Sequence, residues 1–125
     1  PFRVAVRHTP LSRSHPRARD AAIAAECARD QGRFAEMHQT LFSEQVAVNE
    51  ARWTELAARA GVVDTVLHQK CMASDAKSGV LAADSLAAAS VGFRGTPMLI
   101  VNGRVIPGVP ATEALVKLVR ASIGD

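Results

Sequence analysis

The sequence has no tyrosine, and four phenylalanines with one tryptophan make its aromatic content only 4% of 125 residues. Because strands are enriched in aromatic side chains and alanine is abundant here, this composition favours packed helices over an all-β sandwich. The two cysteines form no Cys-x-x-Cys pair, and no His-x-x-x-His pair occurs, so neither spacing supports a zinc site. No apolar run approaches the roughly 18 residues of a membrane-spanning helix.

The composition is that of an ordinary globular protein. Hydrophobic residues make up 48% of the sequence and charged residues 22%, which excludes wholesale disorder. At about 150 residues per domain, the length predicts a single domain. A domain of this size buries roughly two-thirds of its unfolded surface, so it needs no metal or disulfide merely to fold.

Positive charge is concentrated near the start of the chain, and the net charge is +3. Five arginines precede the first acidic residue, Asp20: Arg3, Arg7, Arg13, Arg17 and Arg19. Such a run is compatible with a nucleic-acid-binding patch or with the solvated start of a helix. Because no aromatic side chains alternate with these arginines, a platform for stacking bases lacks its main component. We therefore prefer the solvated interpretation and expect no nucleic-acid partner.

Residues 2–7 alternate between apolar and polar or small side chains, with Phe2, Val4 and Val6 on one face. A period of two over six residues predicts a strand with one buried face. A loop follows and leads into a helix, in which Pro16 suits the first helical position because its missing N–H costs nothing there.

Alanine content and helical periodicity predict five helices after this strand. They are expected at residues 17–31, at residues 33–45, between a cap at Asn49 and a stop at Gly61, after a cap at Asp64, and at about 75–91. One apolar stripe of the second helix is expected to be buried: Phe34, Met37, His38, Leu41 and Phe42. Trp53 lies on the inner face expected for the third helix, so we interpret it as a core residue rather than a ligand platform.

The last part of the chain has a different pattern. Residues 98–101 are apolar on both faces. Asn102-Gly103 then gives the strongest short signal for a β-hairpin, because both central positions of a type I′ turn need positive φ. Residues 104–106 are the expected partner strand. A final helix is expected at about 111–123, with these side chains facing inward: Leu115, Val116, Leu118, Val119 and Ile123.

Three groups of short motifs follow one another along the chain. The first covers residues 2–11 (FRVAVRHTPL) and 15–16 (HP); the second covers 24–28 (AAECA), 31–34 (QGRF), 37–38 (MH) and 41–42 (LF); the third covers 92–97 (GFRGTP), 101–103 (VNG) and Gly108. Each group is moderately specific alone. In this order and spacing, over nearly the whole chain, they resemble the DsbA-like branch of the thioredoxin-fold family.

The resemblance implies an α/β fold, an incomplete thioredoxin-like domain over residues 1–125. A helical subdomain at about 16–91 would be inserted before the hairpin and helix at about 92–123. Family members begin with a strand and a helix whose start carries a redox Cys-x-x-Cys pair, whereas residues 2–7 here resemble the family's second strand. We therefore expect a truncated piece of a longer protein. Its open strand edges would be covered by a second copy, as a homodimer, or by the two strand segments closing up antiparallel.

Gly95-Thr96-Pro97 matches the cis-proline loop of the family. The resemblance implies a cis Thr96–Pro97 bond, which lets the groups of Thr96 bind an extended peptide by strand addition. Gly95, Thr96 and Pro97 are thus the expected substrate-binding residues. The alternative is a plain turn into the following strand.

Cys27 and Cys71 lie 44 residues apart on two different predicted helices. Some members of the family carry a second, structural disulfide between these helices, and an even cysteine count in an extracytoplasmic protein favours the same pairing. Buried free thiols are one alternative. A metal site is another, because His68 and Cys71 are three residues apart, with Cys27 and His38 as possible additions. Both cysteines lie beyond the first turn of their helices, so we expect neither to be a catalytic thiolate.

His8, His15 and His38 are the candidates for a general base, but none stands at a recognisable spacing from a nucleophile. Polar contacts in the core or at loop ends are the preferred interpretation. We expect no catalytic residue, no metal and no cofactor in this chain.

Two functions from different classes remain open. The first is a thiol:disulfide oxidoreductase of the DsbA-like type, which exchanges disulfides with cysteine-containing polypeptides and is seen here without its redox pair. The second is a redox-silent peptide-binding or vestigial module. By resemblance, the parent protein would be bacterial and extracytoplasmic: periplasmic, secreted or membrane-anchored. The chain alone is expected to be inactive.

Overall fold

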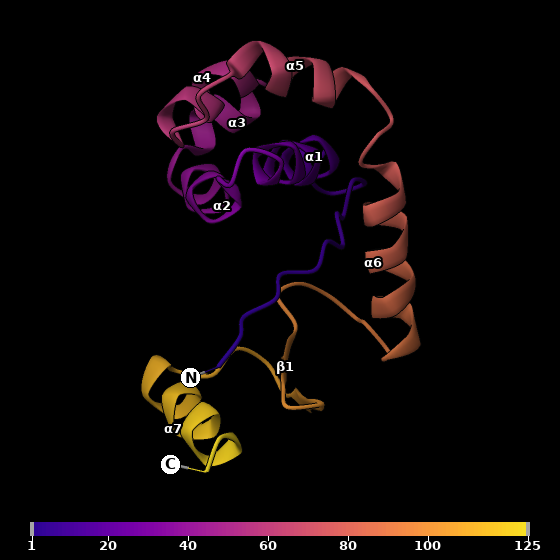
Figure 1. The fold of residues 1–125 in the computed structure, drawn as a ribbon. Helices are drawn as coiled ribbons and strands as arrows, with labels where there is room; N and C mark the ends of the chain where they lie inside the picture. Colours follow the sequence, from indigo (N-terminus) through magenta and orange to yellow (C-terminus); the bar gives the residue numbers. More distant parts are fainter. Residues whose placement is uncertain (1, 125) are drawn as a thin grey trace. The chain divides into compact units, whose positions relative to one another are not determined.

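The computed structural model of the protein describes residues 2–124. Its elements in chain order are α1 (Ala18–Arg29), α2 (Phe34–Ser43), α3 (Gln45–Asn49), α4 (Trp53–Arg59), α5 (Thr65–Ala73), α6 (Ser78–Ser90), β1 (Leu99–Val101), β2 (Arg104–Ile106) and α7 (Thr112–Ser122) (Figure 1). The chain is therefore rich in helix, with one small sheet in its described part, as an α/β fold requires.

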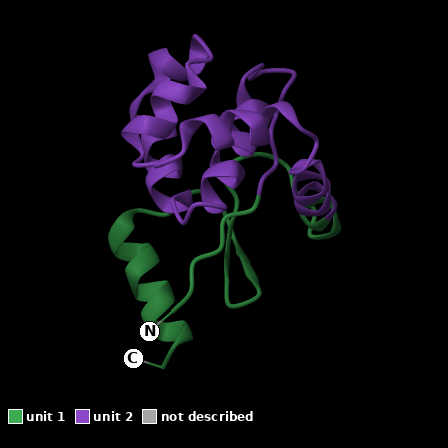
Figure 2. Ribbon diagram, turned by 45° about the horizontal axis from the view of Figure 1, so that its top comes forward, with its two compact units in different colours: residues 1–7, 87–125 green, residues 8–86 purple. Residues whose placement is uncertain are grey.

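The chain is divided into two compact units (Figure 2). Residues 8–86 form a helical unit, and the stretches up to residue 7 and from residue 87 onward form the second unit. Within residues 2–124, no helix combines the length and the apolar character needed to cross a membrane.

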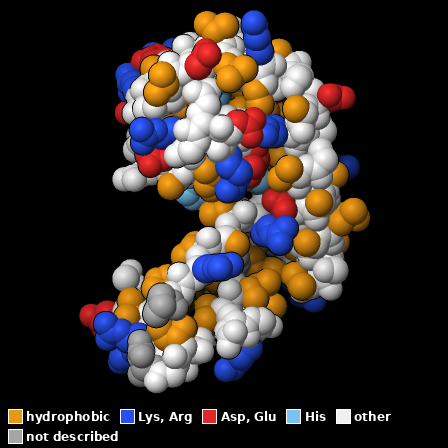
Figure 3. Space-filling model, in the orientation of Figure 1, with side chains coloured by type: hydrophobic (Ala, Val, Ile, Leu, Met, Phe, Trp, Pro, Cys, Tyr) orange, Lys and Arg blue, Asp and Glu red, His pale blue; other side chains and the backbone are white. Residues whose placement is uncertain are grey.

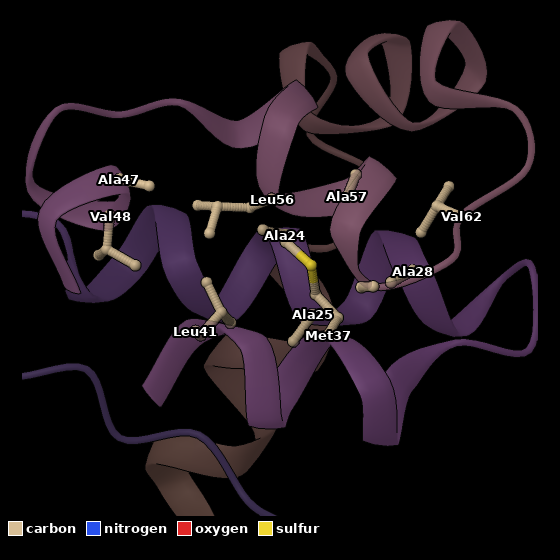
Figure 4. Close-up of a cluster of buried hydrophobic side chains, with 11 residues drawn as sticks. Ala24, Ala25, Ala28, Met37, Leu41, Ala47, Val48, Leu56, Ala57 and Val62 are labelled. Carbon is tan, nitrogen blue, oxygen red and sulfur yellow. The ribbon is translucent and has the colours of Figure 1, made fainter. Parts of the chain in front are cut away.

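The core of the helical unit is built around α1, which packs against α2, α4 and α5. Small alanine side chains on α1 allow these helices to approach closely, and larger side chains fill the space between them. Figure 4 shows this cluster, which comprises Ala24, Ala25, Ala28, Met37, Leu41, Ala47, Val48, Leu56, Ala57, Ala60 and Val62. Trp53 packs against the cluster, as expected for a core residue, but is only half-buried.

The predicted buried stripe of α2 is only partly correct. Met37 and Leu41 are buried, whereas Phe34 and His38 are half-buried and Phe42 is 72% exposed. Successive residues lie about 100° apart around a helix, which places Phe42 roughly 100° from Leu41 and 140° from Met37. Phe42 therefore lies on the flank of the helix, outside the face that meets the core.

The region between Ser43 and Trp53 differs from the prediction. A short helix, α3, fills part of the expected loop, and Asn49 ends this helix instead of capping the next one. The residue that precedes α4 is Arg52, and Ala51 before it has a positive φ of 56°, which breaks the helical path. The cap at Asp64 is confirmed, because its side chain accepts a hydrogen bond of 2.9 Å from the N–H of Leu67.

The predicted hairpin is present in the second unit. β1 and β2 are antiparallel, with Leu99 opposite Ile106 and Val101 opposite Arg104. Asn102 and Gly103 have φ values of 49° and 82°, as a type I′ turn requires.

The predicted final helix forms as α7 and packs against β1, but it buries less than expected. Leu115, Leu118 and Val119 are half-buried, whereas Val116 and Ile123 are 41% and 39% exposed. A sheet of two three-residue strands is too narrow to cover a whole helix face, which explains the difference.

The strand predicted at residues 2–7 is wrong. This segment joins no sheet in the described structure, and Phe2 and Val4 are 63% and 79% exposed. A segment with alternating side chains forms a strand only when its backbone pairs with a neighbouring strand. Among the described residues, β1 pairs only with β2, so residues 2–7 have no strand to pair with. The antiparallel closure of this segment on the hairpin is therefore not observed.

Candidate functional site

The loop between α6 and β1 contains the expected substrate-binding residues. The Thr96–Pro97 peptide bond is cis, the isomer that the resemblance implies. Gly95 is half-buried, and Thr96 and Pro97 are exposed at the entrance to β1. A Cβ atom added at Gly95 would meet no atom within 4 Å. The structure thus brings all three residues together on an open surface.

This loop leads into a strand with one unpaired edge. β1 pairs with β2 on one side, and its other edge has no strand partner among residues 2–124. Within the same residues, neither the backbone N–H nor the C=O of Thr96 has a hydrogen-bond partner. Because an extended peptide adds to a sheet through such unpaired backbone groups, the arrangement is suited to strand addition.

Cys27 on α1 and Cys71 on α5 form a disulfide, with their Cα atoms 5.8 Å apart. The alternatives of two free thiols and of thiolate metal ligands do not apply to this state. Cys27 is 1% exposed and packs against Ile23 and Leu81, whereas Cys71 is half-buried. Both residues lie in the later part of their helices, away from the N-termini that would favour a thiolate. The disulfide therefore joins two helices of the core, and neither of its sulfurs lies at a helix N-terminus that would stabilise a thiolate.

His8 belongs to a buried polar network that the sequence did not predict. Its Nε2 lies 2.7 Å from Glu26 Oε1, and its backbone N–H donates to Asp84 Oδ2 at 2.9 Å. Arg29 donates two hydrogen bonds to the carboxylate of Glu26, at 2.8 and 3.2 Å. Burial raises the pKa of Glu26, but the hydrogen bonds from Arg29 and His8, with their positive charges, outweigh it and leave this pKa below its ordinary value. The available signal was a charged residue inside the apolar stretch of residues 24–28.

The contacts described for the other histidines involve no nucleophilic side chain. The ring of His38 stacks on Phe34 at 5.8 Å and meets the edge of Phe42 at 5.0 Å. Burial lowers the pKa of His38, and the charge of His8 adds to the effect. His68 is buried, with Nε2 2.9 Å from the carbonyl oxygen of Ala24. His15 is exposed, and within residues 2–124 no histidine bonds a serine, threonine or cysteine side chain.

The residues considered as an alternative metal site do not assemble. His68 and His38 are held by other contacts, and Cys27 and Cys71 are bonded to each other. In the part of the chain that the structure describes, no group of three or more His, Cys, Asp or Glu side chains is placed to hold a metal ion.

The sequence of the chain is similar to those of known proteins. The family model of the DSBA-like thioredoxin domain matches residues 3–120. A relative named Na(+)/H(+) antiporter NhaA 3, from Salinispora tropica, is 38% identical over 109 residues, which are 87% of this chain and 17% of that protein. Na(+)/H(+) antiporter NhaA 1 from Mycolicibacterium gilvum is 34% identical over 122 residues, 94% of this chain and 19% of its own length. The chain thus spans less than a fifth of these relatives. The match over nearly all of its residues establishes that the chain belongs to the family of DSBA-like thioredoxin domains.

Proposed function

We propose that this chain is the substrate-binding part of a DsbA-like thiol:disulfide oxidoreductase whose redox Cys-x-x-Cys pair lies outside the present sequence. The observation that carries the proposal is the exposed Gly95-Thr96-Pro97 loop, which leads into the unpaired edge of β1 in a chain of this family. In this proposal residues 1–125 are an incomplete thioredoxin-like domain with a helical insertion at about 16–91.

The substrate class is a cysteine-containing polypeptide in an extended conformation. Its backbone pairs with the N–H and C=O of Thr96, which holds a substrate cysteine near the redox pair of the whole protein. A substrate thiolate then attacks one sulfur of the redox disulfide, forms a mixed disulfide and releases the other sulfur as a thiolate. A second substrate thiolate attacks the mixed disulfide, so the substrate leaves oxidised and the redox pair reduced.

The same unpaired edge suggests the partners of the chain. In the longer protein, the preceding strand covers the edge. In the isolated chain, a second copy covers it and forms a homodimer, which sedimentation at two concentrations would detect. The proposed location is extracytoplasmic, as part of a longer and membrane-anchored protein, which agrees with the antiporter names of the relatives.

Peptide binding at the loop tests this function. The probe is an extended heptapeptide with serine in place of cysteine, which removes covalent exchange. A Gly95→Gln side chain would project from the loop and obstruct the peptide, so we expect about tenfold weaker binding by NMR titration. Gly79→Gln is the matched control, because Gly79 also has open space around it but lies in α6.

Equal peptide affinity of Gly95→Gln and the unaltered chain would contradict the proposed site. Resonance changes confined to residues far from Thr96 would do the same. If no peptide binds at all, a vestigial module becomes the better explanation of the chain.

A further inference from the structure

A surface depression lies within the helical unit, and the proposed function does not use it. Its volume is about 330 Å³, and α1, α4 and α5 contribute its walls. The residues that matter for its chemistry are Asp20, Trp53, His68 and Met72. The volume is near the lower end of the range for ligand pockets, which is large enough for a small organic group.

His68 lines the depression and has a buried side-chain nitrogen without a hydrogen-bond partner. The residue is 1% exposed, and its Nε2 lies 2.9 Å from the carbonyl oxygen of Ala24. A carbonyl only accepts, so Nε2 carries a proton, and in the Nε2–H tautomer Nδ1 has a lone pair. Among the described residues, this Nδ1 is the buried side-chain nitrogen that lacks a hydrogen-bond partner. Buried polar atoms normally have hydrogen-bond partners. The unpartnered Nδ1 of His68 therefore favours a ligand that can donate a hydrogen bond to it.

Asp20 contributes negative charge to the same depression. It lies in the first turn of α1 and is half-buried. Within residues 2–124 its side chain has no ion-pair or hydrogen-bond partner. The nearby arginines bind elsewhere, since Arg17, just before α1, donates to the carbonyl of Asn49 and Arg19 on α1 donates to Ser78. No lysine or arginine of the described chain lines the depression.

The remaining walls also favour positive charge. The half-buried ring of Trp53 offers a π face, which attracts cations more strongly than the other aromatic side chains do. Met72 adds a polarisable thioether beside it. A carboxylate, an imidazole lone pair, a π face and a sulfur are together complementary to a cation that carries N–H donors and a short apolar stem.

We propose that this depression binds an organic cation of the alkylammonium or guanidinium type, either free or as a lysine or arginine side chain. Asp20 balances the charge, the ring of Trp53 packs on the stem and the cationic head, and His68 Nδ1 accepts one N–H bond. The site is independent of the Gly95-Thr96-Pro97 loop, so it stands or falls separately from the proposed oxidoreductase.

Fluorescence of the full chain tests the proposal directly. Trp53 is the single tryptophan and the sequence has no tyrosine, so the emission reports on this depression alone. We expect butylammonium to change the emission saturably in about the millimolar range, as a ligand of five heavy atoms allows. Butan-1-ol and butanoate, which have the same stem without the positive charge, should bind at least about tenfold more weakly.

N-acetyl-lysine amide separates the two sources of the cation. Tighter binding of this compound than of butylammonium would indicate a peptide side chain, and equal binding would indicate a free amine. Both results support a cation site. The absence of a saturable change with either compound, or equal binding of butan-1-ol, would overturn it.

Two further measurements assign the roles of the residues. Asp20→Asn should weaken butylammonium binding about tenfold, whereas Asp75→Asn, at an exposed carboxylate in the same unit, should leave it unchanged. In the unaltered chain, the ¹⁵N resonance of His68 Nδ1 should move upfield with butylammonium, because its lone pair accepts a hydrogen bond. Unchanged binding by Asp20→Asn, or an unmoved Nδ1 resonance, would contradict the assignment.

Discussion

Glu26 is a charged residue within alanine-rich α1, and only 4% of its surface is exposed. Such a group is costly to bury unless its charge is balanced and its oxygens are bonded. Arg29 and His8 provide both, and the guanidinium of Arg29 also lies 4.0 Å from the centre of the Phe34 ring. The network therefore fixes the segment that precedes α1 against the helix itself.

The lowered pKa of Glu26 has a consequence for stability. A carboxyl group whose pKa is depressed on folding stabilises the fold above its unfolded pKa, and this contribution is lost as pH falls through the folded pKa. We expect Glu26→Gln to lower the free energy of unfolding at pH 7 by about 2 kcal/mol or more, because Arg29 and His8 lose their charged partner. Urea unfolding between pH 7 and pH 3 measures this.

The difference between Glu26→Gln and the unaltered chain should shrink as the pH falls below 4.5, the ordinary pKa, because the unfolded chain then takes up a proton at Glu26. The difference is lost as the pH falls through the lowered pKa of the folded state, where the native carboxylate is protonated as well. Glu113→Gln, at an exposed position on α7, is the control and should change stability little. A deficit for Glu26→Gln that stays constant from pH 7 to pH 3 would show that the charge of Glu26 is not the cause.

At the scale of elements, the Cys27–Cys71 disulfide joins α1 to α5 across 44 residues. In the chain-entropy account, a closed loop of this length stabilises the fold by about 4 kcal/mol. We expect the double variant Cys27→Ala/Cys71→Ala to unfold at markedly lower urea concentration, because the unfolded chain gains that freedom.

A thiol assay on the unfolded, unreduced chain supplies the control for this variant. It should find no free thiol, whereas the same chain after reduction should have two, as its two cysteines require. Two titratable thiols before reduction would mean that the disulfide does not form, and stability equal to the double variant would then be expected.

Elements determined by local signals were predictable from the sequence. The Asn102-Gly103 turn needs only residues that tolerate positive φ, and the Asp64 cap needs only a side-chain oxygen near the N–H of Leu67. Elements that depend on a neighbour were not predictable in this way. The buried face of α2 excludes Phe42 because only the packed helices define where the core lies.

At the scale of the whole molecule, the second unit exposes several large apolar side chains. Figure 3 shows hydrophobic side chains on the surface of this unit, and Phe2, Val4, Ile100 and Val105 are between 47% and 79% exposed. The alternation at residues 2–7 predicts a strand, yet strand formation needs a neighbouring strand, and the sheet of the described chain contains only β1 and β2. The loop at Thr96 was predictable from the family motif. The depression beside Trp53 was not, because α1, α4 and α5 create it only by packing together.

The proposed division between substrate binding and redox chemistry predicts that the isolated chain has no thiol:disulfide exchange activity. Its one disulfide has Cys27 buried in an apolar cluster, so an attacking thiolate reaches the bond mainly at Cys71 and must expel a buried thiolate from Cys27. Burial in apolar surroundings raises a thiol pKa, and a thiolate of high pKa is a poor leaving group. We therefore expect no insulin reduction above that of a folded Cys27→Ser/Cys71→Ser variant. Turnover clearly above this variant would show that the disulfide itself is catalytic, and the redox pair would then have to be sought within the chain.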